Sequence, residues 1–134
     1  MTGLVIKLAP NERMLINGAV IENGDRRTRI SILTPNANLL RLRDAIHPDD
    51  ADTPVKRMCC LAQMVLAGDA DVAETRQSLI RGIEQLSQVF SDEDSRRILD
   101  MASRAVLADE VYQALRSLRT LLPREERLFA VQRP

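Results

Sequence analysis

The spacing of apolar residues changes abruptly at residues 47–52, a short segment rich in proline and aspartate. Before this segment, apolar and polar residues alternate with a period of two, which is typical of half-buried strands. After it, apolar residues recur every three or four positions, which is typical of amphipathic helices. The sequence therefore predicts an α+β protein. A small antiparallel β-sheet or barrel of about five short strands occupies residues 1–50, a hairpin or bundle of three to four helices occupies residues 51–134, and the two parts form one compact domain.

Two Asn-Gly pairs mark tight turns in the β part, at Asn17-Gly18 and Asn23-Gly24. Both residue types tolerate the positive φ that hairpin turns of the primed types require. The alternating pattern predicts strands over residues 3–8, 13–16, 19–22, 27–33 and 38–43. If these strands form one sheet, its solvent face carries five cations: Lys7, Arg27, Arg29, Arg41 and Arg43.

Capping signals divide the helical part. Thr53 followed by a proline is typical of a helix start, and Gly68 is typical of the residue after a helix end. Asp69 or Asp71 then opens a second helix that reaches about residue 90. Gly82 is a weak point within that helix, because glycine is a poor helix former.

The boundaries of the later helices follow from the same rules. Ser91 precedes three acidic residues and is the expected N-cap of a further helix. Residues 92–122 form either one continuous helix or two helices, the second beginning at Asp109. Pro123 is expected to end the helical part and to leave a charged tail.

The strongest candidate binding site is the cationic face of the predicted sheet. Basic and acidic residues are equal in number, 19 each, so a cationic cluster is a local feature of an otherwise neutral chain. Arginine forks match phosphate geometry, and phosphate contacts supply much of the affinity for RNA. We therefore predict an RNA-binding surface formed by Lys7, Arg26, Arg27, Arg29, Arg41 and Arg43. In the alternative interpretation these cations are solvated or pair with nearby carboxylates, namely those of Glu12, Glu22, Asp25 and Asp44.

The apolar helical stripes allow a second hypothesis. A small sheet cannot cover every stripe, so Leu115, Leu118 and Leu122 are candidates for contact with another protein or with a second copy of this chain. In the alternative interpretation these leucines belong to the core of the protein itself.

Catalytic, metal and membrane functions lack sequence support. His47 is the sole histidine, and the two cysteines, Cys59 and Cys60, are adjacent, which does not match the spacing of zinc ligands. At least one cysteine is expected to be a small core residue. We predict no catalytic residue, no metal and no cofactor. No run approaches the roughly 18 apolar residues that span a bilayer, and no leader pattern opens the chain, so we expect a cytoplasmic protein without membrane contact.

Several segments resemble the FlbT family of alphaproteobacterial flagellum biosynthesis regulators. The densest likeness lies in Ile16-Asn17-Gly18-Ala19-Val20, Asn23-Gly24-Asp25-Arg26-Arg27 and Leu40-Arg41-Leu42-Arg43-Asp44-Ala45-Ile46, and it continues at Thr53-Pro54 and Tyr112-Gln113-Ala114-Leu115. The resemblance implies a protein that binds the 5′ untranslated region of flagellin mRNA and represses its translation or promotes its decay. It also implies FlaF or flagellin as protein partners.

A shorter likeness points to the same kind of function. Arg43-Asp44-Ala45-Ile46 is similar to the strand that closes the sheet in CsrA-type RNA-binding regulators, whose arginine at that place binds RNA. The resemblance implies that Arg43 is an RNA ligand, and it adds a homodimer to the expected assemblies.

Overall fold

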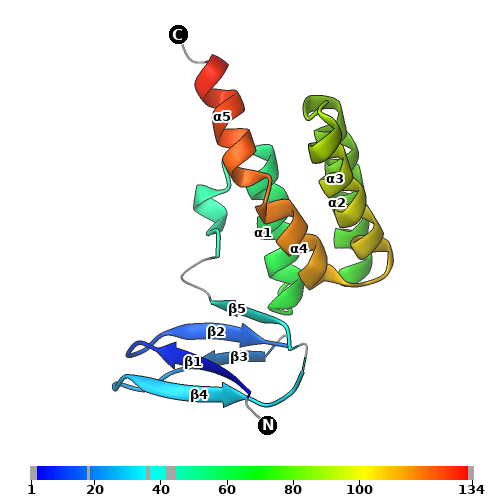
Figure 1. Ribbon diagram of the computed structural model, residues 1–134. Coiled ribbons are helices and arrows are strands. Elements are labelled where there is room, and N and C mark those ends of the chain that lie inside the picture. The colour runs from blue at the N-terminus through cyan, green and yellow to red at the C-terminus, as the bar shows by residue number, and fades with distance from the viewer. Residues whose placement is uncertain (1–2, 18, 36, 42–44, 133–134) are drawn as a thin grey trace. The chain divides into compact units, whose positions relative to one another are not determined.

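A computed structural model describes residues 3–17, 19–35, 37–41 and 45–132 (Figure 1). The predicted α+β class is confirmed. The chain divides into two compact units, residues 1–45 and residues 46–134, and all described strands lie in the first unit. Within the described ranges, every helix is too short or too polar to cross a lipid bilayer.

The β unit contains five short strands in two antiparallel sheets. One sheet pairs β1 with β4, and the other has the strand order β3-β2-β5. The strands are β1 (Leu4–Leu8), β2 (Arg13–Ile16), β3 (Ala19–Glu22), β4 (Thr28–Ile32) and β5 (Leu39–Arg41). The predicted set of about five short antiparallel strands is confirmed, but the strands form two sheets in place of a single one, because β4 pairs with β1.

The two Asn-Gly pairs have different roles. Asn17 lies in the two-residue turn between β2 and β3 and has a φ of 49°, as the hairpin prediction requires. Asn23 makes no hairpin. Its side-chain amide donates to the carbonyls of Ala9 and Arg26, both at 2.8 Å. These bonds fasten the connection between β3 and β4 beside the β1–β2 turn, so that the chain passes from one sheet to the other.

The two sheets share one apolar core. Ile6 and Leu8 of β1 and Met14 of β2 are buried at its centre, with other apolar residues of both sheets packed against them: Ile16, Ile21, Ile30, Ile32 and Leu39. Strand residues alternate between two faces. Burial of Ile6 and Leu8 therefore turns Lys7 to the opposite, exposed face of the β1–β4 sheet.

The helical unit opens with a short 3-10 helix, η2 (Pro48–Asp50), and continues with five α-helices. These are α1 (Pro54–Leu66), α2 (Val72–Val89), α3 (Glu93–Leu107), α4 (Val111–Arg119) and α5 (Leu122–Gln132). Helix α1 packs against α2, α4 and α5, and α3 packs against α2 and α4. The core contains Val55, Cys59, Ala62, Leu79, Ile83, Leu86, Leu99, Ala102, Val106, Leu115 and Leu118.

Several predicted helix boundaries are confirmed. The Thr53 hydroxyl accepts from the Lys56 amide at 3.3 Å, and Gly68 has a φ of 79° after the end of α1. The Asp71 carboxylate caps α2 by accepting from the Glu74 amide at 3.0 Å.

Other boundaries differ from the prediction. Asp92, not Ser91, caps α3, since its carboxylate accepts from the Ser95 amide at 2.9 Å. Residues 92–122 form two helices, which are separated at Asp109 by a φ of 60°. The charged tail expected after Pro123 is helical, because this proline occupies the first turn of α5, where no amide donor is needed.

Gly82 allows a close approach of two helices. It is buried on α2, and a Cβ at this position would overlap the sulfur of Met58 on α1. The absence of a side chain at Gly82 thus makes the space that the Met58 side chain fills.

Candidate nucleic-acid interface

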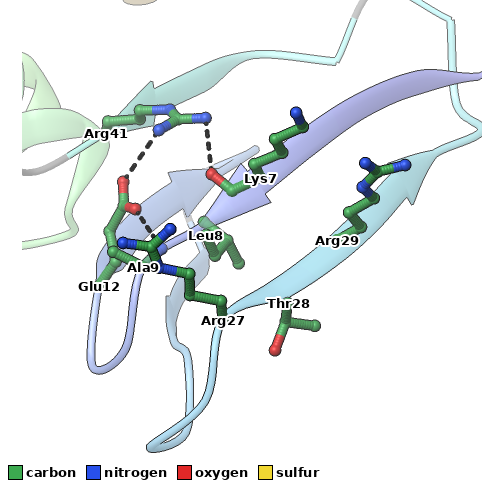
Figure 2. Close-up of a pocket in the computed structure, with 8 residues that line it drawn as sticks. All are labelled: Lys7, Leu8, Ala9, Glu12, Arg27, Thr28, Arg29 and Arg41. Atoms are coloured by element: carbon green, nitrogen blue, oxygen red, sulfur yellow. Dashed lines mark hydrogen bonds and ion pairs between the residues drawn. The ribbon is translucent and has the colours of Figure 1, made fainter.

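An open groove of about 620 Å³ lies in the β unit and gathers most of the predicted cationic residues (Figure 2). It is lined by four cationic side chains and one carboxylate, which gives its lining a formal charge of +3. The lining residues are Lys7, Leu8, Ala9, Glu12, Arg27, Thr28, Arg29 and Arg41.

Lys7 and Arg29 line this groove from the exposed face of the β1–β4 sheet. They are directly opposite each other in the β1–β4 ladder and share its exposed face. Like charges at directly opposed positions destabilise a strand pair. Within the described ranges, neither side chain forms an ion pair that would offset this repulsion. An anion bound between Lys7 and Arg29 would offset it.

Arg41 has a different environment. Its guanidinium donates to the Glu12 carboxylate at 3.3 Å and to the Lys7 carbonyl at 3.0 Å, as Figure 2 shows. The Arg41 side chain is 24% exposed and that of Glu12 only 6%. The other Glu12 oxygen accepts from the Ala9 amide at 2.9 Å. For Arg41, the structure therefore agrees with the alternative interpretation, in which a cation of the sheet pairs with a nearby carboxylate, here that of Glu12.

The other predicted RNA ligands, Arg26, Arg27 and Arg43, differ in their relation to the groove. Arg27 lines the groove beside Thr28 and is exposed. Arg26 is exposed but does not line the groove. Arg43 lies outside the described residues, as do Gly18 and Asp44. Three of the six predicted cations, Lys7, Arg27 and Arg29, thus meet in the groove without an ion pair in the part of the chain that the structure describes.

Glu12 holds together two parts of the groove lining, a role that differs from the neutralising partner expected from the sequence. Its carboxylate joins the β1–β2 turn to β5, which lies 29 residues later in the chain. The available signal was its position in a short turn after Pro10, where a carboxylate can accept from a backbone amide three residues earlier. The contact with Arg41 depends on the fold and has no local signature.

The second predicted site lies in the helical unit. Leu115 and Leu118 are buried in its core, and Leu122 is half-buried at the start of α5. Leu122 also lines a groove of about 500 Å³ of mixed character, in which Ile46, Pro123, Phe129 and Ala130 alternate with polar and charged residues: Asp52, Thr53, Lys56, Glu125 and Glu126. Contact of the three leucines with another protein stays a prediction, and Leu122 is the most accessible of them.

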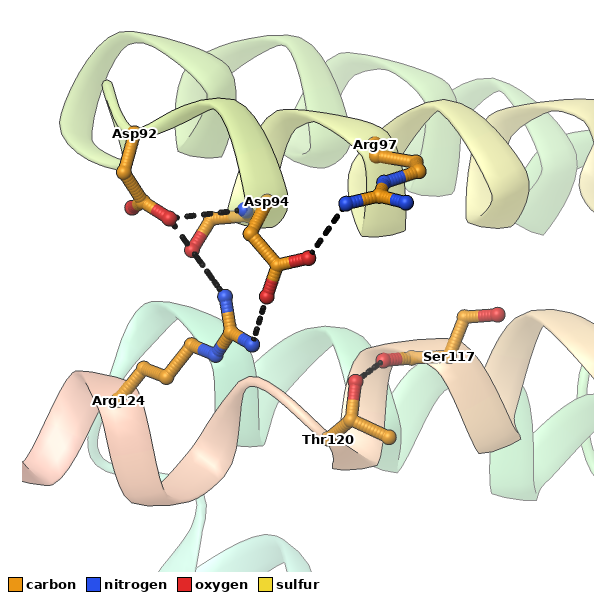
Figure 3. Close-up of polar contacts among 7 residues, drawn as sticks. Asp92, Asp94, Arg97, Ser117, Thr120 and Arg124 are labelled. Carbon is orange, nitrogen blue, oxygen red and sulfur yellow. Dashed lines mark hydrogen bonds and ion pairs between the residues drawn. The ribbon is translucent and has the colours of Figure 1, made fainter.

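Two neighbouring residues of α5 fasten it to the other helices. Arg124 donates to Asp94 at 2.5 Å and to the Ser95 hydroxyl at 2.8 Å at the start of α3 (Figure 3). The hydrogen bond from Arg124 holds the pKa of Asp94 below its ordinary value. The next residue, Glu125, is buried, accepts from the Val55 amide at 2.8 Å and takes the hydroxyl hydrogen bond of Thr53.

The cysteine and histidine side chains of the helical unit lie in surroundings that give them no reactive partner among the described residues. Cys59 and Cys60 are both buried, so the expected core role is confirmed. Burial raises the pKa of Cys59 to about 12 and raises the pKa of Cys60 as well, which keeps both sulfurs as thiols. His47 is exposed and accepts from the Asp49 amide at 3.1 Å. In the described ranges, no three potential metal ligands converge.

Comparison with known proteins gives a consistent family. A family model described as "Flagellar protein FlbT" matches residues 4–129. A relative from Mesorhizobium japonicum is 34% identical over 124 residues, which cover 92% of this chain and 83% of that protein. A relative from Rhodopseudomonas palustris (strain TIE-1) is 32% identical over 95% of this chain and 98% of its own length, and one from Caulobacter sp. (strain K31) is 30% identical over 92% and 93%. All three are named "Probable flagellum biosynthesis repressor protein FlbT". No solved structure matches the chain.

Proposed function

Because this chain belongs to the FlbT family of flagellar proteins, we propose that it represses flagellum biosynthesis by binding RNA in the cationic groove of its β unit. The names of its relatives support regulation of flagellum synthesis. The groove supports the mode of action, because Lys7, Arg27 and Arg29 present positive charge on one accessible surface. This clustering of cations is the observation that carries the proposal.

The ligand of the groove is the phosphate backbone of a single strand or loop. Residues 1–45 contain no aromatic side chain, so bases cannot stack on rings in this unit. Lys7 and the arginines supply phosphate contacts, and an arginine fork can also bond the edge of a guanine. Affinity would thus come mainly from charge, with a smaller contribution from base recognition.

The proposed target is the 5′ untranslated region of flagellin mRNA. A protein bound there would obstruct translation in the cytoplasm without any chemistry of its own. A separate nuclease would carry out the decay of the transcript. The role of the protein is then to occupy RNA, which a groove of cations performs without catalytic residues.

The test measures binding of the wild-type chain to a fluorescein-labelled flagellin 5′ untranslated region at several salt concentrations. Three phosphate contacts predict that the logarithm of the binding constant falls with a slope of about −2 against the logarithm of salt. The double variant Lys7→Gln/Arg29→Gln should bind more weakly and should reduce this slope by about 1.4. Arg26→Gln, which removes an exposed cation outside the groove, is the matched control.

Two results would reject the proposal. One is the absence of RNA binding by the wild-type chain at low salt. The other is an equal loss of affinity in the double variant and in Arg26→Gln, because that would make the groove no more important than any exposed cation.

A second candidate function rests on the groove of mixed polar and apolar lining at α5. Leu122 and Phe129 line it, and Leu128 and Val131 are exposed on the same helix. We propose protein binding there as the alternative, with FlaF, flagellin or a second copy of the chain as the partner. Phe129→Asp should abolish such association and leave the helical unit folded, since Phe129 is exposed. Unchanged association would remove this candidate.

A further inference from the structure

Arg41 connects two walls of the cationic groove, and its contacts differ from those of the other cations. We propose that Arg41 is a positioning residue, which holds Lys7 and the β1–β2 turn in place and does not itself bind phosphate. This inference rests on the proposed function of the groove and assigns separate roles to its cations.

The bonds of Arg41 leave it poorly available to a ligand. One side of its guanidinium bonds the Glu12 carboxylate at 3.3 Å, and another nitrogen bonds the Lys7 carbonyl at 3.0 Å. Two of its nitrogens are thus engaged, and a phosphate that replaced the acceptor at the first of them would have to displace Glu12, whose side chain is almost fully buried. Separating Arg41 from this poorly solvated carboxylate would remove a charged hydrogen bond from a partly buried pair, which is unfavourable.

The same bonds determine the shape of the groove. Arg41 belongs to the β3-β2-β5 sheet, whereas Lys7 belongs to the β1–β4 sheet, and among the described residues no strand ladder joins these two sheets. Arg41 therefore joins the two sheets by its hydrogen bond to the backbone carbonyl of Lys7, and the side chain of Lys7 lines the groove. Lys7 and Arg29 are opposite each other in the β1–β4 ladder, so a fixed β1 backbone fixes the point from which the Lys7 side chain extends beside Arg29.

A lysine cannot replace Arg41 in this arrangement. The planar fork reaches two acceptors in different directions, while a lysine ammonium is a compact charge on a flexible stem. If the side chain of residue 41 bound phosphate directly, replacement of arginine by lysine would be tolerated, because lysine also binds phosphate as a point charge. The variant Arg41→Lys thus separates a positioning role from a ligand role at constant net charge.

Glu12→Gln separates the two roles by the sign of its effect. The substitution removes a negative charge from the groove lining, so a purely electrostatic site should bind RNA more tightly. If Glu12 and Arg41 hold the groove in shape, binding should instead weaken, because the Gln amide cannot replace a carboxylate that serves both Arg41 and Ala9.

The experiment titrates the full chain and its variants with a short labelled single-stranded RNA and, separately, with inorganic pyrophosphate followed by NMR shifts of Lys7 and Arg29. We expect Arg41→Lys to bind both ligands about tenfold more weakly and Glu12→Gln about fivefold more weakly. The salt slope should stay unchanged in both variants. Lys7→Gln, as a loss of a phosphate contact, should reduce the slope by about 0.7. Circular dichroism at the titration temperature establishes that each variant is folded.

Tighter binding by Glu12→Gln, or wild-type affinity in Arg41→Lys, would overturn the positioning role. A wild-type chain that binds pyrophosphate but not RNA rejects the proposed function, and the pyrophosphate series then decides the role of Arg41. A chain that binds neither ligand overturns both proposals.

Discussion

Removing the carboxylate of Glu125 should destabilise the helical unit far more than removing the carboxylate of Glu126. Glu125 is 5% exposed, accepts from the Val55 amide at 2.8 Å and takes the Thr53 hydroxyl hydrogen bond at the start of α1. It therefore satisfies an amide at a helix N-terminus, where a negative charge is also favourable.

The expected loss follows from these two bonds. Hydrogen bonds to a charged acceptor contribute about 1.5–3 kcal/mol each, and release of the carboxylate from burial offsets part of the sum. We expect Glu125→Ala to lower the free energy of unfolding by about 3 kcal/mol. For a unit of the size of residues 46–134, this corresponds to a fall in Tm of about 12–24 °C. Glu125→Gln should lose about 1 kcal/mol, because its amide can still accept from Val55 and donate to Thr53.

Thermal and urea unfolding followed by far-ultraviolet circular dichroism measure these differences. Glu126→Ala is the matched control, since Glu126 is exposed on the same helix and should change stability by less than about 0.5 kcal/mol. Equal effects of Glu125→Ala and Glu126→Ala would refute the reasoning, because the buried bonds would then contribute nothing measurable.

Three further predictions concern packing, pH and reactivity in the helical unit. Gly82→Ala should change the free energy of unfolding in urea by less than about 1 kcal/mol, because the gain in helix propensity offsets the cost of turning the flexible Met58 side chain away from the added Cβ; a much larger loss would contradict this adaptability. The hydrogen bond from Arg124 lowers the pKa of Asp94 below 3.8, so its contribution to stability is present above that pH and is lost as the pH falls. Asp94→Asn should therefore reduce stability at neutral pH and flatten the acid limb of a pH–stability curve, and an unchanged limb would contradict this role. In a Cys60→Ala variant, the thiol of Cys59 should react with a disulfide reagent only after unfolding, because burial raises its pKa to about 12; rapid labelling of the folded chain would contradict this environment.

Local signals in the sequence predicted the elements well. Thr53, Gly68 and Asp71 mark helix ends because each acts on backbone groups within a few residues. Asn17 marks a hairpin for the same reason. Such contacts depend on the nearby chain alone, so a sequence pattern contains the information that determines them.

Contacts between distant residues could not be predicted in this way. The alternating pattern does not state which strands pair, and the choice of β1 as the partner of β4 produces two sheets in place of one. That choice brings Lys7 opposite Arg29 in one sheet, whereas Arg41 lies in the other sheet and bonds the Lys7 carbonyl. The capping of α1 by Glu125, about 70 residues away in the chain, likewise depends on helix packing. The cationic residues were thus predicted as a group, whereas their individual roles required the fold.

The adjacency of Arg124 and Glu125 sets a limit on how the chain length can vary. Consecutive residues point about 100° apart around a helix, so the first reaches α3 while the second reaches α1. Loss or gain of one residue between Thr120 and Arg124 would rotate α5 by that angle and misdirect both side chains together. Length differences among functional relatives should therefore occur elsewhere, such as the bend at Asp109, and this short stretch should keep a constant number of residues.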